Sequence, residues 1–119
     1  GWILEKFWAW TDNEGRPDDA VELDALLDNV MVYWLNAAGA SSGRIYWESF
    51  GSFISEPVTV PTGISQFPKE IFSASRRWAE RIYTDIRWWN ELARGGHFAA
   101  LEEPDLFVSE VRSFFRLVR

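Results

Sequence analysis

The chain has 119 residues, of which 47% are hydrophobic, and it carries a net charge of −6 at pH 7. This length allows one domain at most, or part of a larger one, and the hydrophobic content argues against disorder. The negative charge argues against a nucleic-acid-binding protein, because the arginines form no basic stripe. With no cysteine and a single histidine, the chain offers neither disulfides nor enough ligands for zinc, so we expect no metal and no other cofactor.

Aromatic residues are frequent, with eight Trp, nine Phe and three Tyr. A small domain has difficulty covering so much aromatic surface, so we expect some of it to meet another surface. No apolar run approaches the length of a membrane span and no signal-peptide pattern is seen. We therefore expect a soluble, cytoplasmic chain.

The first half of the sequence predicts helices. Apolar residues between Trp2 and Trp10 are spaced as in a short amphipathic helix, and the segment TDNEGRPDD after it predicts a loop. A longer helical stripe follows, made of Leu23, Leu26, Leu27, Val30, Met31, Trp34 and Leu35. We expect Asp19 and Glu22 to form a capping box at its start and Gly39 to provide its C-cap.

A third short helix is predicted through GRIYWESF, with Ser41 or Ser42 as its cap and Gly51 at its end. Residues 1–55 are therefore expected to be helical throughout. Because the sequence begins at Gly1 inside the first helical pattern and without methionine, we expect it to have been cut from a longer chain.

The pattern changes at Pro57. The segment PVTVPTGISQFP is rich in β-branched residues and predicts a strand around Val58–Val60, or a longer one that continues past Thr62. The segment SASRRWAERIY then predicts a helix with Ser73 or Ser75 as its N-cap.

A second strand is predicted in TDIRWWNEL, with Ile86 and Trp88 on one face. After a loop that contains two glycines, the last helix is expected to open with the acids Glu102, Glu103 and Asp105 around Pro104, which suits the helix dipole and the fixed φ of proline. Its apolar face consists of Phe107, Val111, Phe114, Phe115 and Val118, and Arg112, Arg116 and Arg119 lie toward its end.

Residues 56–119 therefore read as strand, helix, strand, helix. A strand–helix–strand unit of this length implies parallel pairing through a right-handed crossover, so the predicted fold class is α/β. Two parallel strands are too few for a free-standing sheet. We expect the sheet to need neighbours that this chain does not contain.

Two chemically complementary residues follow the two predicted strands. Reactive groups of open α/β sheets lie on loops at the carboxyl ends of the strands, and here those loops carry Glu70 and His97. A Glu that orients a His is the acid–base half of a hydrolase triad, and the order acid then histidine matches that of α/β-hydrolases. Taken singly, His97 is more often a structural donor, Glu70 a solvated acid at a helix start and Tyr46 a packing residue. The joint interpretation depends on the two loops being neighbours.

The same segments point to a family. VPTGISQFPKEI followed by RGGHFAALEEPDL resembles the carboxyl-terminal part of microsomal-type epoxide hydrolases, which have the α/β-hydrolase fold, and LDNVMVYWL and SSGRIYWESF resemble the lid of that family. The resemblance implies that residues 1–55 are a lid segment and residues 56–119 the end of the core. In such enzymes an aspartate opens the epoxide to form an ester, two lid tyrosines hold and protonate the epoxide oxygen, and a His–Glu pair activates the water that releases a vicinal diol.

Carried over by position, this resemblance implies that His97 is the general base, Glu70 its orienting acid and Tyr46 one lid tyrosine. No segment matches the turn that carries the aspartate nucleophile, the oxyanion-hole loop or the other lid tyrosine. We therefore expect a carboxyl-terminal fragment, natural or engineered, that does not turn over epoxides alone. The expected partners are a second copy of the chain or a complementary amino-terminal half, with an apolar epoxide as substrate of the intact enzyme. The alternatives are a non-catalytic, self-associating fragment and a small-molecule binding module.

Overall fold

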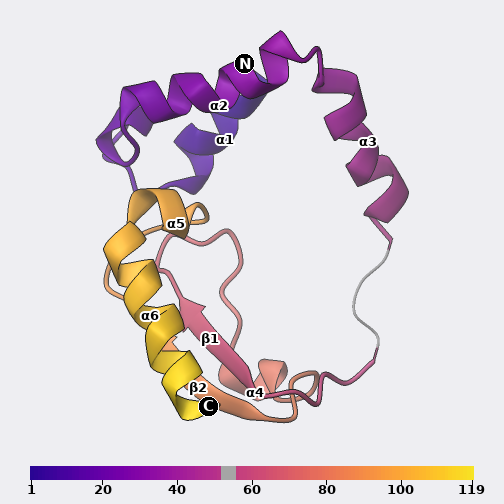
Figure 1. The fold of residues 1–119 in the computed structure, drawn as a ribbon, viewed down its shortest axis with the longest axis vertical. Helices are drawn as coiled ribbons and strands as arrows, with labels where there is room; N and C mark the ends of the chain where they lie inside the picture. Colours follow the sequence, from indigo (N-terminus) through magenta and orange to yellow (C-terminus); the bar gives the residue numbers. More distant parts are fainter. Residues whose placement is uncertain (52–55) are drawn as a thin grey trace.

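The computed structural model describes residues 1–51 and 56–119, with helices at the amino-terminal end and a two-stranded sheet flanked by helices at the other (Figure 1). The first part contains α1 (Trp2–Trp10), the 3₁₀ turn η1 (Pro17–Asp19), α2 (Leu23–Leu35) and α3 (Gly39–Ser49). The three predicted helices are all present.

A small core joins α1 and α2. Phe7, Val21 and Leu26 are buried together, and Ile3, Ala20 and Phe98 pack against them. The Phe7 and Phe98 rings lie 4.6 Å apart between centroids. Because Phe98 comes from the far end of the sequence, this core attaches the helical part to the loop that carries His97.

The predicted N-cap of α2 is wrong. The Asp19 carboxylate accepts the backbone N–H of Arg16 at 3.1 Å, so it caps the turn that begins at Pro17, whose fixed φ favours an earlier helical start. Glu22 is the N-cap residue of α2 and makes no side-chain cap bond.

The predicted C-cap of α2 is also wrong, because the helix ends with Asn36 as its cap and not with Gly39. Ala37, with a φ of 49°, takes the left-handed conformation, two residues before Gly39, which is the first residue of α3. Ser42 does not cap α3 from outside, because it lies within the helix and its hydroxyl donates to the Ala38 carbonyl at 2.7 Å. Ser41 is likewise inside the helix and bonds to the same carbonyl.

The carboxyl-terminal part contains β1 (Thr62–Gln66), α4 (Arg76–Ala79), β2 (Ile86–Glu91), α5 (Ala99–Glu102) and α6 (Pro104–Leu117). The strands pair in parallel, with Gly63 opposite Trp88 and Gln66 opposite Glu91. Of the two predicted forms of the first strand, the longer one is closer, since the ladder begins at Thr62. The preceding Val58 makes only an isolated bridge to Tyr83, and the intervening Pro61 has no N–H to donate to a ladder.

Two predicted helices are shorter than expected. Only Arg76–Ala79 of the segment from Ser73 to Tyr83 is helical, because the Ile82 carbonyl accepts a bond from Val58 and leaves the helix to bridge the chain before β1. At the last helix, Pro104 stands in the first position of α6, so Glu102 belongs to the short α5 that precedes it.

Helix α6 packs along the sheet (Figure 1), and two side chains define the contact. A Cβ on Gly63 would lie 2.7 Å from the Phe114 ring, so only glycine permits this approach. Glu110, which is 9% exposed, accepts three hydrogen bonds from the sheet. The donors are Ser65 Oγ at 2.7 Å, Trp88 Nε1 at 2.8 Å and Asn90 Nδ2 at 2.9 Å. Burial raises the pKa of Glu110, but the three side-chain donors lower it by more, so the pKa lies below the usual range of a glutamate.

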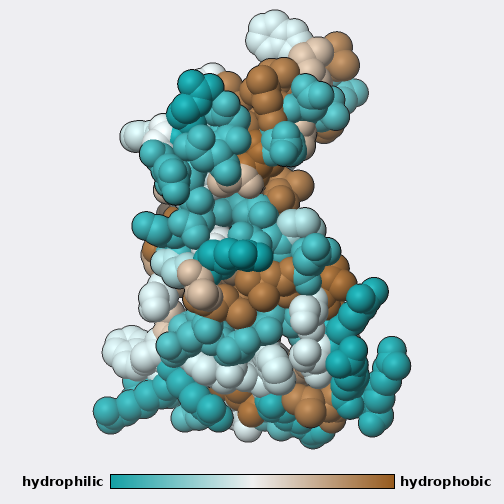
Figure 2. Space-filling view, turned by 90° about the vertical axis from the view of Figure 1, so that its left-hand side faces the viewer, coloured by the Kyte–Doolittle hydropathy of each residue, from teal (hydrophilic) through white to brown (hydrophobic). Residues whose placement is uncertain are grey.

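Large apolar side chains remain at the surface. The most exposed of them are Trp34, Leu35, Trp47, Phe50, Phe72 and Trp78, each at least 70% accessible. Figure 2 shows hydrophobic residues among hydrophilic ones on one face, both in the upper part and in a band lower down. Across residues 1–51 and 56–119, no helix combines the length and the hydrophobicity that crossing a lipid bilayer requires.

Candidate active site

The structure brings Glu70 and His97 together at the carboxyl ends of the two strands. Their loops are linked by the backbone bond from Lys69 N–H to the Gly95 carbonyl, at 3.1 Å, and by a parallel bridge between Lys69 and Gly96. The Nδ1 atom of His97 lies 2.7 Å from Oε1 of Glu70. Parallel pairing therefore places the two residues as the sequence predicted.

The contact assigns separate tasks to the two imidazole nitrogens. An ionised carboxylate accepts hydrogen bonds and donates none, so Nδ1 carries the hydrogen in this pair and a neutral His97 has its lone pair on Nε2. The same Oε1 of Glu70 also accepts the Ile71 N–H at 2.7 Å, which fixes the carboxylate from its own loop. About a third of each side chain is accessible, so the pair can meet a water molecule.

The loop before His97 requires both of its glycines. Gly95 has a φ of +99°, and a Cβ there would lie 2.7 Å from the Phe67 ring. A Cβ on Gly96 would lie 2.6 Å from the Trp10 carbonyl oxygen. The close approach lets the His97 N–H donate to that carbonyl at 2.8 Å, so the loop sits against the end of α1.

Replacing Gly96 by alanine is therefore expected to destabilise the chain by about 1–3 kcal/mol, because the added methyl group collides with backbone and not with a flexible side chain. The matched control is Gly43→Ala in α3, where a Cβ would meet no atom within 4 Å. That change should stabilise the chain by roughly 0.5–1 kcal/mol through helix propensity. Urea unfolding of both variants checks the pair, and equal effects would contradict this account of the loop.

Two carboxylates hold this loop from different parts of the chain. Asp12 Oδ2 accepts the Gly95 N–H at 2.9 Å. Glu102 accepts three backbone N–H groups, from Phe98 on Oε1 at 2.9 Å and on Oε2 from Gly96 at 2.9 Å and Asp12 at 2.7 Å. The backbone on both sides of His97 is thus anchored.

Neither anchoring role is predicted by the sequence. Glu102 lies in the predicted first turn of the last helix and Asp12 in a predicted polar loop. The two glycines before the histidine are the one indication in the sequence, because the backbone N–H groups of such a loop need acceptors and a nearby carboxylate can supply them. No pattern indicates that Asp12, distant in sequence by 83 residues from Gly95, is one of them.

Aromatic rings surround the imidazole. The Trp10 ring meets His97 edge-on with centroids 5.1 Å apart, and Phe98 does so at 5.0 Å. These contacts limit rotation of the ring about its side-chain bonds. They also give the site apolar walls.

His97 and Tyr46 line the same pocket, which has a volume of about 550 Å³. Tyr46 comes from α3, and the Trp2 ring meets it edge-on at 6.3 Å. The three candidate residues are thus connected to one site, because Glu70 contacts His97 and Tyr46 lines the same pocket as His97. Tyr33 of α2 lines it as well.

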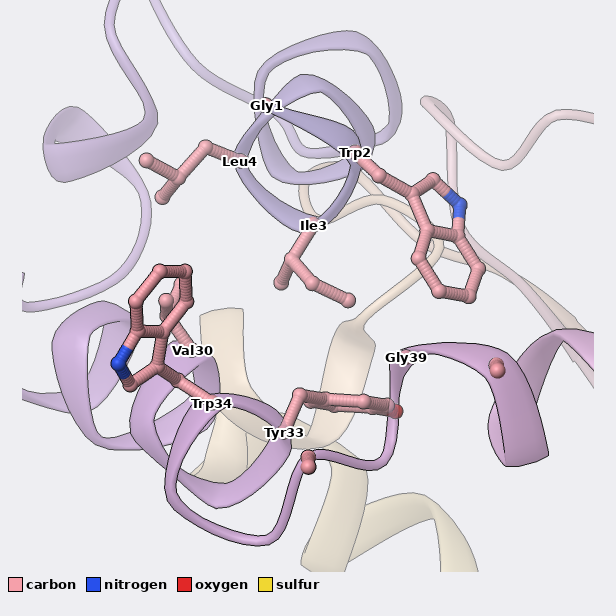
Figure 3. A pocket seen from close by; sticks show the side chains of 10 residues that line it. Gly1, Trp2, Ile3, Leu4, Val30, Tyr33, Trp34 and Gly39 are labelled. Atoms are coloured by element: carbon pink, nitrogen blue, oxygen red, sulfur yellow. The ribbon is translucent and has the colours of Figure 1, made fainter.

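A second pocket of about 500 Å³ lies next to the first, between α1 and α2 (Figure 3). Ile3 and Leu4 of α1 and Val30 and Trp34 of α2 project toward it. The two pockets share Trp2, Ile3 and Tyr33. The two pockets therefore share walls made by α1 and α2.

Known proteins with similar sequences are epoxide hydrolases. A putative epoxide hydrolase of Stigmatella aurantiaca is 52% identical over 99% of this chain, and epoxide hydrolase 1 of Sus scrofa is 38% identical over 98%. Among solved structures, the juvenile hormone epoxide hydrolase of the silkworm Bombyx mori superposes with a TM-score of 0.81 over 99% of this chain, at 31% identity. No protein-family profile matches the chain.

The matches cover only part of each relative. The chain spans 27% of the bacterial protein, 28% of the pig protein and 34% of the silkworm structure. The resemblance inferred from the loop and lid motifs is confirmed, as is the partial α/β-hydrolase fold. Over nearly its whole length, the chain is therefore homologous to one part of the epoxide hydrolases and shares the α/β-hydrolase fold of that part.

Proposed function

We propose that this chain supplies the water-activating half of an epoxide hydrolase. His97 is the general base, Glu70 orients it, and Tyr46 assists in opening the epoxide. The aspartate nucleophile comes from a part of the protein outside these residues. The observation that carries the proposal is the 2.7 Å contact between His97 Nδ1 and Glu70 Oε1, with His97 and Tyr46 lining one pocket.

The first step needs a nucleophile and an acid. A carboxylate oxygen attacks one epoxide carbon, the C–O bond on that carbon breaks, and an ester forms. The leaving oxygen would become an alkoxide, so the Tyr46 hydroxyl donates its proton to it. Tyr46 lines the pocket, which supports this role, and a substrate held there would be partly shielded from bulk water.

The second step hydrolyses the ester. His97 Nε2 accepts a proton from water while the water oxygen adds to the ester carbonyl. Glu70 stabilises the imidazolium that forms, because its carboxylate accepts the Nδ1–H. Collapse of the tetrahedral intermediate expels the diol oxygen, which takes the remaining hydroxyl proton as the carboxylate re-forms. The His97 imidazolium then gives its proton, directly or through water, to the Tyr46 phenolate, so no net proton is released.

Substrate class follows from the pocket walls. The two adjoining pockets are lined mostly by aromatic and aliphatic side chains. We therefore propose an epoxide with an apolar substituent, whose reactive ring lies between Tyr46 and His97.

The test reassembles the two halves. The chain is produced together with the part of the Stigmatella aurantiaca protein that it does not match, and diol formation from styrene oxide is measured. We expect turnover from the co-purified pair and none from either half. No diol from a co-purified pair, or turnover by this chain alone, would contradict the proposal.

Self-association is a second candidate property, favoured by the exposed large apolar side chains. Trp47 is 90% and Phe72 81% accessible, and burial of apolar surface is worth roughly 25 cal/mol per Å². We expect a second copy of the chain to cover part of this surface. Sedimentation velocity at micromolar concentration should then show a concentration-dependent dimer or larger species, whereas a well-folded monomer throughout would count against it.

A further inference from the structure

We infer that Glu102 is a positioning residue that determines which nitrogen of His97 is available as the base. This inference rests on the proposed function, because it concerns the same imidazole. Glu102 touches neither Glu70 nor the imidazole by hydrogen bonding. It acts through the backbone of the loop that carries His97.

The geometry gives Glu102 an unusual position. Its two oxygens accept the N–H groups of the residues immediately before and after His97, at 2.9 Å each. Two fixed points on either side of one residue leave little freedom for its Cα–Cβ direction. The direction in which the imidazole leaves the backbone therefore depends on this carboxylate.

The third bond of Glu102 connects the loop to the helical part. Its Oε2 also accepts the Asp12 N–H at 2.7 Å, and the Asp12 carboxylate in turn accepts the Gly95 N–H. The carbonyl of Trp10, two residues before Asp12, accepts the His97 N–H, and the Trp10 ring lies against the imidazole. The loop is thus aligned with α1, which supplies pocket walls, as well as with Glu70.

A full carboxylate is needed for this arrangement. Three N–H groups point at two oxygens, and an ionised carboxylate has acceptor sites for all of them and no hydrogen of its own. A glutamine would turn an NH₂ group toward at least one backbone N–H. The loop would then shift, and the Nδ1–H bond to Glu70 would lengthen.

The imidazole tautomer reports this shift directly. In the wild-type chain, at a pH where His97 is neutral, the contact with Glu70 favours hydrogen on Nδ1. Free histidine prefers hydrogen on Nε2, so loss of the contact reverses the preference. Because His97 is the only histidine in the chain, its ¹⁵N resonances are unambiguous.

The experiment compares ¹⁵N-labelled wild-type chain with Glu102→Gln, Glu70→Ala and Glu103→Gln. We expect Glu102→Gln to lower the ratio of the Nδ1–H to the Nε2–H form by roughly tenfold, toward the ratio in Glu70→Ala. Glu103→Gln is the matched control, because it removes the same charge at the next residue, whose carboxylate pairs with the exposed guanidinium of Arg94. It should leave the ratio unchanged.

A purely structural role would lower the unfolding midpoint of Glu102→Gln without moving the tautomer ratio, and that result would overturn the inference. If Glu102→Gln does not fold, Glu102→Asp serves, since it keeps the charge but its shorter side chain cannot reach both of the N–H groups that flank His97, and it should move the ratio in the same direction. An unchanged ratio in folded Glu102→Asp would overturn the inference equally. An Nε2–H form in the wild type would instead remove the His97–Glu70 pair, and with it the proposed function.

Discussion

In the reassembled enzyme, replacing His97 by glutamine is expected to stop diol release while ester formation continues. Glutamine cannot accept a proton from water at the position of Nε2, so hydrolysis loses its general base. General base catalysis contributes about 10²–10⁴-fold, and we expect turnover to fall by that factor. Intact-protein mass spectrometry should then show the nucleophile-bearing half heavier by the mass of one epoxide.

Tyr46→Phe is the matched variant, because it removes one oxygen from the same pocket and affects the earlier step. It should slow formation of the ester and leave no accumulated adduct. The two variants therefore separate the two proposed roles by what accumulates as well as by rate. If His97→Gln turned over at the wild-type rate, or if it accumulated no ester while Tyr46→Phe did, the assignment of roles would be wrong.

The paired residues were predictable from sequence for a specific reason. Glu70 and His97 each follow a strand, and parallel pairing brings the carboxyl ends of neighbouring strands to the same edge. The contact then depends only on strand order, which periodicity and turn residues indicate. The existence of the helices was predictable on the same basis.

What could not be predicted depends on competition between local signals or on distant contacts. Asp19 could cap either the turn that begins at Pro17 or the helix that begins at Leu23, and the fixed φ of Pro17 favours the earlier turn. Helix α4 is short because Ile82 bonds to Val58 across the crossover. Glu102 looked like any acid near a helix start, and its partner Asp12 lies 90 residues away.

The position of Glu110 in the sequence is itself informative. It lies three residues after Phe107 and four before Phe114, on the apolar face of the last helix. An acid at such a position is either exposed by a break in the face or buried with partners. The structure shows the second case, with three donors from the sheet.

Glu110→Ala is therefore expected to lower the free energy of unfolding by about 2–4 kcal/mol, because it leaves three donors between α6 and the sheet without their acceptor. The control is Glu80→Ala, which removes an exposed glutamate paired with Arg76 and should cost less than about 1 kcal/mol. Urea unfolding measures both. Similar losses in the two variants would show that burial at this position matters little.

The pH dependence of the same contact has a definite sign. Because the folded state lowers the pKa of Glu110, protons bind the unfolded state more readily at this residue. Its contribution is complete above the unfolded value of about 4.3 and is lost as the pH falls through the folded pKa. Glu110→Gln is neutral at every pH, so the stability difference between wild type and this variant should stay constant at neutral pH and shrink in the acidic window. A difference that persists unchanged into strong acid would mean that the ionised carboxylate is not what joins α6 to the sheet.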